Sequence, residues 1–196
     1  MDGRQGVGGM SDEHESAERE LKFAGVEHSL LRERLIDWEA ECQGSGTLED
    51  NWVFDRDGTV AAAGQVLRLR VDRRGTHLTF KGPATFDGTV KVRVEHETGV
   101  EDPKKMRAIL EALGFETVRR YQKIREEWRL GSIKVALDHT PIGDFVELEG
   151  EGCERLARRF GLDPARAERR SYLRLYEEYK KDHPEAPADM IFPPAE

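Results

Sequence analysis

Charged and apolar residues alternate with a period of two along most of this chain, and this alternation limits the folds that it can adopt. Successive side chains of a β-strand point to opposite faces, so a period of two collects the charges on one face and the apolar groups on the other. We expect eight strands, at roughly 17–24, 50–55, 65–73, 76–82, 89–98, 117–129, 132–139 and 144–150. The pattern recurs in seven of them, and turn pairs such as Asp57-Gly58 between strands favour antiparallel neighbours.

Helical periodicity appears in four other segments. We expect helices at 26–42, 103–113, 151–160 and 164–182. The second and the fourth each begin with an Asp-Pro pair, Asp102-Pro103 and Asp163-Pro164, which supplies an N-cap and a first helical residue. The chain then divides into a mobile leader at 1–15, one domain at 16–183 and an extended tail at 184–196.

The charged faces of these strands can point either to solvent or to the inside of a closed sheet. For any single strand, a solvated charged face is the ordinary arrangement. Here the charged positions are almost always Arg, Lys, Glu or Asp and seldom Ser, Thr or Gln, which favours the second arrangement. Eight strands can close around a bore that holds side chains or one small ligand. The expected fold is therefore α+β, an eight-stranded antiparallel β tunnel with a charged interior, covered by amphipathic helices.

This arrangement predicts a lumen in which the two signs nearly balance. The inward cations would be Lys22, Arg68, Arg70, Lys81, Lys91, Arg93, Lys123, Arg125 and Lys134. The inward carboxylates would be Glu18, Glu20, Glu95, Glu97, Asp138, Glu147 and Glu149. Pairing among these groups is a poor reason to confine them, because each ion loses hydration in the bore. A triphosphate, which needs Arg and Lys donors, together with Mg²⁺ or Mn²⁺, which needs carboxylate oxygens, uses both signs.

Composition excludes several other classes of protein. A formal charge of -8 argues against a sequence-blind nucleic-acid binder, and the apolar runs are too short to span a bilayer. The six histidines show no zinc-binding spacing, and Cys42 and Cys153 form no CxxC motif, so both are expected to be reduced thiols. We therefore expect a cytoplasmic protein that binds neither nucleic acid nor membrane, as a monomer or a homodimer.

The charged motifs, taken in order, resemble those of the CYTH family, the triphosphate tunnel metalloenzymes. The family includes class IV adenylate cyclases, thiamine triphosphatases and inorganic triphosphatases. Residues 18–22 resemble its ExExK signature, 67–70 its LRxR strand, 80–83 its TxKGP strand, 93–97 its RxExE strand, 123–125 its KxR strand, and 137–149 its closing LD…GxFxExE segment. The resemblance covers about residues 17 to 176 and implies an eight-stranded tunnel with helices outside.

The resemblance also implies roles for individual residues. The implied metal-binding carboxylates are Glu18, Glu20, Glu147 and Glu149, with Asp138, Glu95 and Glu97 as further members. For Glu95 and Glu97, orienting neighbouring Arg side chains is an equal alternative. The implied triphosphate-binding residues are Lys22, Arg68, Arg70, Lys81, Arg93, Lys123 and Arg125, with Arg170 at a tunnel mouth. Lys22, Lys81 and Glu20 are the implied catalytic residues, and Mg²⁺ or Mn²⁺ is the implied cofactor.

The sequence leaves the reaction open. We expect metal-dependent hydrolysis of a phosphoanhydride bond in an inorganic or organic triphosphate. A class IV adenylate cyclase that makes cyclic AMP and pyrophosphate, and a non-catalytic module that binds triphosphate or polyphosphate, are the alternatives. A Lys-Tyr pair used by some relatives is doubtful here, because the second strand carries Trp52 and Phe54. We expect these two aromatic side chains to pack outside the tunnel.

Overall fold

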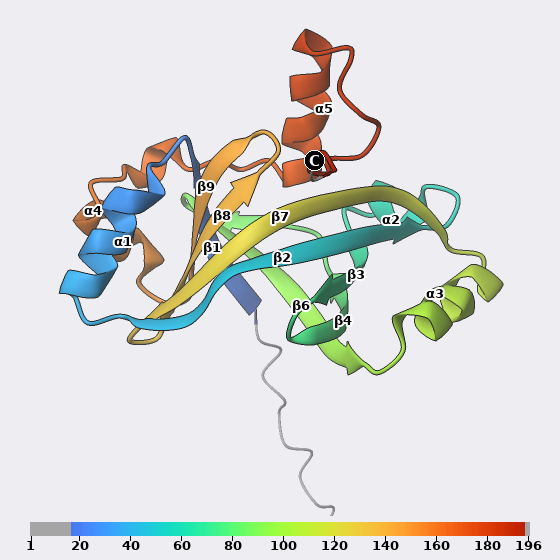
Figure 1. The fold of residues 1–196 in the computed structure, drawn as a ribbon, viewed down its shortest axis with the longest axis horizontal. Helices are drawn as coiled ribbons and strands as arrows, with labels where there is room; N and C mark the ends of the chain where they lie inside the picture. The colour runs from blue at the N-terminus through green and yellow to red at the C-terminus, as the bar shows by residue number, and fades with distance from the viewer. Residues whose placement is uncertain (1–16, 195–196) are drawn as a thin grey trace, which may run out of the picture.

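The computed structural model describes residues 17–194, so the leader expected at 1–15 and the last two residues of the tail lie outside the described part (Figure 1). The strands are β1 (Ala17–Ala24), β2 (Glu41–Asp55), β3 (Val66–Asp72), β4 (Gly75–Lys81), β5 (Thr85–Asp87), β6 (Val90–Val100), β7 (Glu116–Leu130), β8 (Ile133–Thr140) and β9 (Gly143–Glu149). The helices are α1 (His28–Asp37), α2 (Thr59–Ala62), α3 (Pro103–Ala112), α4 (Cys153–Arg159) and α5 (Tyr172–Asp182), with a 3₁₀ turn at Pro164–Arg166.

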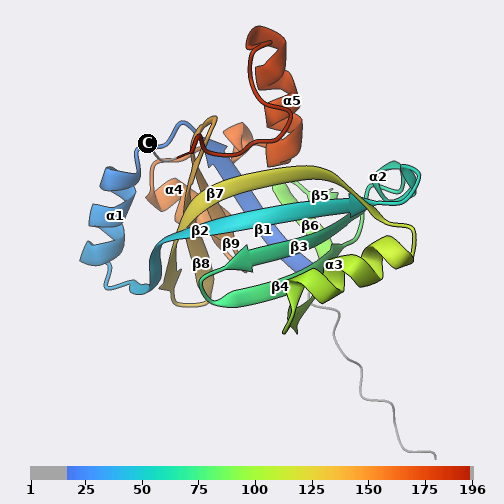
Figure 2. The same cartoon turned by 45° about the vertical axis from the view of Figure 1, so that its right-hand side comes forward.

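The strands form one antiparallel sheet that closes on itself. Their order is β1-β9-β8-β7-β2-β3-β4-β6-β5, and an additional pairing of β1 with β6 closes eight of them into a barrel. The closing register sets Glu18 opposite Arg93 and Glu20 opposite Lys91. The short β5 adds to β6 outside the closed ring. Figure 2 shows the long strands β2 and β7 running side by side across the barrel wall. The predicted tunnel fold is confirmed, with one outer strand that was not expected.

The apolar faces of the strands lie outside the barrel, under helices. On one side, α1 and α4 pack on β1, β8 and β9, where Leu21, Val135 and Leu148 are at most 1% exposed among fifteen buried residues of one cluster. On the other side, α3 places Leu110 against Phe54 and Leu69, with Trp52 at the edge. Burying each of these large side chains contributes about 2 kcal/mol. The expected outward packing of Trp52 and Phe54 is confirmed.

Helix α5 has a different position from the other helices. It stands at one end of the barrel instead of lying along its wall (Figure 1). Tyr172 and Tyr176 of α5 share a buried cluster with Val53, Tyr121 and Phe145. The expected cover of amphipathic helices is thus present, with α5 at a different place from α1, α3 and α4. The apolar face of α5 packs over a mouth of the lumen.

Two predicted helices have different bounds in the structure. The helix expected at 26–42 ends at Asp37, and Glu39 adopts a left-handed conformation with φ 55°, which stops the helix. Residues from Glu41 onward instead pair with β7, so tertiary pairing overrides local helical pattern there. The helix expected at 164–182 begins only at Tyr172, where the Ser171 hydroxyl accepts a hydrogen bond from the backbone N–H of Arg174.

The described part of the C-terminal tail, residues 184–194, begins with turns and bends and folds back onto β7. Met190 is fully buried and forms an isolated parallel bridge with Tyr121. The backbone N–H of Gln122 donates to the Met190 carbonyl at 2.8 Å, and the Tyr176 hydroxyl donates to the Pro187 carbonyl at 2.7 Å. Phe192 stacks on His139 with 5.5 Å between ring centroids. The tail thus holds the base of α5 against the barrel end.

Candidate functional site

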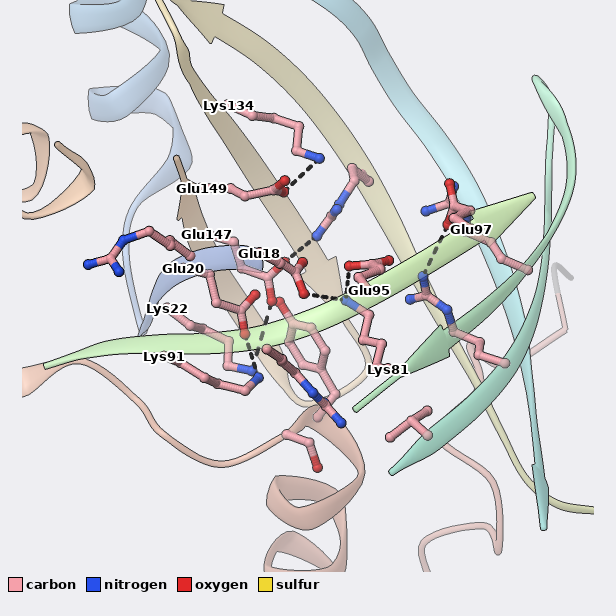
Figure 3. A pocket seen from close by; sticks show the side chains of 18 of the residues that line it. Glu18, Glu20, Lys22, Lys81, Lys91, Glu95, Glu97, Lys134, Glu147 and Glu149 are labelled. Carbon is pink, nitrogen blue, oxygen red and sulfur yellow. Dashed lines mark hydrogen bonds and ion pairs between the residues drawn. The ribbon is translucent and has the colours of Figure 1, made fainter. Parts of the chain in front are cut away.

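The lumen of the barrel is a cavity of about 760 Å³ (Figure 3). Inward side chains of the eight barrel strands line it, together with the first residues of α5. The predicted inward residues that line it are Glu18, Glu20, Lys22, Arg68, Arg70, Lys81, Lys91, Arg93, Glu95, Glu97, Lys123, Arg125, Lys134, Glu147 and Glu149. The alternation therefore predicted the orientation of all these side chains correctly. Asp138 is the predicted inward residue that does not line the cavity.

Oppositely charged side chains pair between nearby strands of the lumen wall. Lys81 Nζ lies 2.7 Å from a carboxylate oxygen of Glu18 and 2.8 Å from one of Glu95. Lys91 Nζ lies 2.5 Å from Glu20, which Figure 3 shows on the neighbouring strand. Although burial alone would lower it, the pKa of Lys81 is raised, because Glu18 and Glu95 stabilise the ammonium form. Without a ligand, these carboxylates supply the counter-charge for the cations.

The deepest ionic cluster centres on Asp138, which is 0% exposed. Its carboxylate accepts hydrogen bonds from Lys123 at 3.0 Å, from Arg125 at 2.7 and 2.6 Å, and from the Tyr172 hydroxyl at 2.7 Å. These donors saturate the carboxylate behind the cavity wall. These contacts favour the hypothesis that Asp138 orients Arg125 and Lys123, whereas the resemblance implied a metal-binding role.

Glu147 lies between this cluster and the open lumen. Its carboxylate is 2.5 Å from Arg125 and 3.8 Å from Lys22. Burial alone would raise the pKa of Glu147, but the neighbouring Lys123, Arg125 and Lys22 cations hold it well below its ordinary value. Glu147 therefore stays ionised over the physiological pH range, as a cation ligand must.

Lys22 is the most enclosed cation of β1, at 4% exposed. Its ammonium lies over the Tyr172 ring, 4.4 Å from the centroid. Burial lowers the pKa of Lys22, and the attraction of Glu147 opposes this effect only in part. An ammonium with so few protein partners is well placed to bind an anion that enters the lumen.

Arg68 also has one donor atom without an acceptor. Its guanidinium donates to the Tyr121 hydroxyl and to Thr79 Oγ1, both at 3.3 Å. Within residues 17–194, Arg68 Nε is buried and has no hydrogen-bond partner. A buried N–H without an acceptor costs about 1–3 kcal/mol.

The carboxylates of β1 and β9 fit a divalent cation by their chemistry. Glu20 and Glu149 are direct cross-strand partners, and both line the lumen. Like charges directly opposite each other are destabilising unless a cation lies between or beside them. Here Lys91 neutralises Glu20, and Lys134 lies 2.6 Å from Glu149. Over residues 17–194, no three His, Cys, Asp or Glu side chains converge as a ready-made metal site. The oxygen donors suit Mg²⁺ or Mn²⁺ once they leave their lysines.

Two residues differ in importance from what the sequence indicated. Arg170 does not line the lumen; it is exposed and pairs with Glu168 and Glu178. Glu49 was missed, although it is 5% exposed and lies 3.5 Å from Lys123. The strand expected at 50–55 begins too late to include Glu49. The period-two pattern of Thr47, Glu49 and Asn51, all buried, would have revealed it.

A closed antiparallel barrel whose lumen is lined by Arg, Lys and Glu defines a tunnel protein with an interior suited to a polyanion and a cation. The model of the CYTH domain family matches residues 16–172, and the chain belongs to this family. Over 102 residues the chain is 35% identical to a protein of Methanocaldococcus jannaschii named as a proposed adenylate cyclase. That match covers 52% of this chain and 58% of the relative.

Solved structures share the fold over most of the chain. A proposed adenylate cyclase of Vibrio parahaemolyticus is 24% identical with a TM-score of 0.72, and the match covers 82% of this chain and 97% of that one. The PH1819 protein of Pyrococcus horikoshii is 27% identical with a TM-score of 0.70, covering 83% and 99%. A proposed adenylyl cyclase of Hippeastrum, described as having a dominant triphosphatase activity, is 17% identical with a TM-score of 0.62, covering 83% and 96%.

Within residues 17–194, no helix has the length and apolar character needed to cross a membrane.

Proposed function

We propose that this protein binds a triphosphate in its lumen and hydrolyses a phosphoanhydride bond with the help of a divalent metal ion. The observation that carries the proposal is the lumen itself, in which Arg and Lys side chains from facing strands surround the same cavity as the carboxylates of β1 and β9. Arg68, Lys81 and Arg125 would bind phosphate oxygens. Fixed cations of this kind stabilise the charge that shifts onto those oxygens in the transition state.

The metal would be held by Glu18 and Glu20 of β1 and Glu147 and Glu149 of β9. Bound Mg²⁺ or Mn²⁺ would neutralise phosphate charge and lower the pKa of a coordinated water. When a triphosphate enters, its oxygens would replace the carboxylates as partners of Lys81 and Lys91. The carboxylates released from these lysines would then become available as ligands. Lys22 would bind the phosphate nearest to α5, because its ammonium lies over Tyr172 at that end.

A class IV adenylate cyclase remains the second candidate function. The Methanocaldococcus jannaschii relative is named for that activity, and its match includes over half of this chain. The Hippeastrum protein, which shares the fold, has a cyclase name and is described as having a dominant triphosphatase activity, so the two activities need separate assays here. We favour hydrolysis because a water nucleophile requires less positioning than a ribose hydroxyl.

The experiment that tests the proposal measures products with Mg²⁺ or Mn²⁺ and tripolyphosphate, thiamine triphosphate or ATP, with separate detection of phosphate and cyclic AMP. Lys22→Met and Glu20→Gln should each remove most turnover, since both side chains line the lumen. Lys105→Met is the matched control, because its side chain is 83% exposed on α3. The proposed site would be refuted if the wild type releases phosphate and Lys22→Met and Lys105→Met reduce that release equally. Cyclic AMP as the main product would reverse the order of the two functions.

A further inference from the structure

Glu49 is a buried carboxylate that contacts cations of the lumen but does not line the lumen itself. It lies on β2, which has β7 on one side and β3 on the other, and it is 5% exposed. Strand register pairs Glu49 with Lys123 of β7, and Arg125 and Arg70 lie opposite the residues two positions before and after it. Glu49 therefore has cations on both neighbouring strands.

The Glu49 carboxylate is close to all three cations but makes no short contact with any of them. Its oxygens lie 3.5 Å from Lys123 Nζ, 3.9 Å from Arg70 Nη1 and 3.9 Å from Arg125 Nε. Within residues 17–194, Glu49 Oε2 is buried and has no hydrogen-bond partner. Burial alone would raise the pKa of Glu49, but these cations lower it to about 2, so the group is an anion at neutral pH.

Asp138 compensates two of the same cations in a different way. It accepts hydrogen bonds from Lys123 at 3.0 Å and from Arg125 at 2.7 and 2.6 Å, so it takes up donor N–H groups as well as charge. Glu49, at 3.5 to 3.9 Å from the same two side chains, reduces their positive charge and leaves their N–H groups to other acceptors. The two carboxylates therefore act differently on an anion that approaches these cations.

The three cations that Glu49 contacts all line the cavity. A polyphosphate in the lumen would approach them from the cavity side, so it and Glu49 would compete for the same positive charge. At the effective dielectric of a partly buried site, a unit charge several ångströms away changes the Kd of a multiply charged anion about tenfold or more. Affinity that acts equally on substrate and product does not accelerate the chemical step, and it slows the release of product.

We infer that Glu49 is a positioning residue that acts through these three cations and limits the anion affinity of the lumen, so that a phosphate product can leave. The inference rests on the proposed binding and hydrolysis of a triphosphate in the lumen. A purely structural ion pair predicts the opposite effect, because cations that lose their buried partner become disordered and bind anions more weakly. The direction of the change in Kd therefore separates the two roles.

The test measures the Kd of tripolyphosphate and of pyrophosphate by calorimetry, with a metal chelator present so that neither turnover nor metal binding contributes. Glu49→Gln keeps the shape of the side chain and removes its charge, and we expect it to bind both anions about tenfold more tightly than the wild type. Glu49→Asp keeps the charge but withdraws it by one methylene group, so the tightening should be smaller, about two- to threefold. If Glu49→Gln fails to fold, Glu49→Asp decides the result.

Asp50→Asn is the matched control. Asp50 is the next residue of β2, but its carboxylate is on the outer wall, 2.6 Å from Arg120. Removing this charge should change both Kd values by less than about twofold, because solvent and salt screen it from the lumen.

Unchanged or weaker anion binding by the Glu49 variants, or equal tightening by Asp50→Asn, would overturn the inference. Tighter binding by Glu49→Gln without hydrolysis by the wild type would refute the proposed activity alone. Hydrolysis by the wild type without tighter binding by the variants would refute the role of Glu49 alone. Absence of binding of both anions to the wild type and to every variant would refute both.

Discussion

Asp138 offers the sharpest test of how the ionic interior is held together. The change Asp138→Asn keeps the shape of the side chain but removes its charge, which leaves Lys123 and Arg125 with less compensation. The lost partner accepts four hydrogen bonds at 2.6 to 3.0 Å and is 0% exposed. Removing one member of a buried ion pair costs about 3–5 kcal/mol. Because Glu49 and Glu147 remain nearby, we expect the lower value, about 3 kcal/mol.

The assay is thermal and urea unfolding in the presence of a metal chelator. For a chain of this size each kcal/mol shifts the Tm by about 2–4 °C, so Asp138→Asn should lower it by roughly 6–12 °C. Asp144→Asn is the control; its side chain is 42% exposed and pairs with His139, and it should change stability by less than about 1 kcal/mol. A loss below about 1 kcal/mol for Asp138→Asn would refute the orienting role. A loss seen only with added Mg²⁺ would restore the metal-ligand interpretation.

Three further predictions concern stability. Burial would raise the pKa of Glu49, but the Lys123, Arg125 and Arg70 cations outweigh it and lower this pKa from 4.5 to about 2. The contribution of Glu49 to the free energy of unfolding is therefore complete above pH 4.5 and is lost as the pH falls towards 2. In urea unfolding from pH 7 to pH 2, the gap between wild type and Glu49→Gln should therefore close in that window, and a constant gap would contradict the shift. Met190→Ala should lower the free energy of unfolding, measured by calorimetry, by about 2–5 kcal/mol, because Met190 is 0% exposed. A change below about 0.5 kcal/mol would show that the tail is not anchored. Asp102→Ala should lower the free energy of unfolding in urea by about 1 kcal/mol, because the Asp102 carboxylate accepts hydrogen bonds from the backbone N–H groups of Lys104 and Lys105 at the start of α3. Asp102→Ser, which keeps a capping oxygen, should retain most of the wild-type stability.

Much of the site was predictable because a strand has only two faces. Once Arg68 and Arg70 are placed on one face and Leu67 and Leu69 on the other, the face of every other residue of β3 follows. Glu49 was missed because the expected strand started at residue 50, although the period of two already holds from Thr47. The segment before Thr47 contains Gly44 and Gly46, and its pairing with β7 has register shifts. Bulges interrupt the period of two, so local pattern does not show where β2 begins.

The role of Asp138 was not predictable for a different reason. Its position in the alternation is the same as that of a lumen-lining residue. Whether it contacts a ligand or only other side chains depends on Tyr172, which is 34 residues later in the chain and arrives with α5. Arg170, by contrast, was expected at a tunnel mouth but is paired with residues close to it in the chain, Glu168 and Glu178.

By itself, the sequence determined the two faces of each strand, the balance of charge on one of them and the resemblance to a tunnel family. These are local or cumulative properties, which depend on side-chain spacing and not on how distant segments meet. Tertiary structure alone decided where α5 lies on the barrel and which carboxylate is sealed behind the wall. Both depend on contacts of α5 with Tyr121 and Asp138, and only chain closure brings those groups within reach of one another.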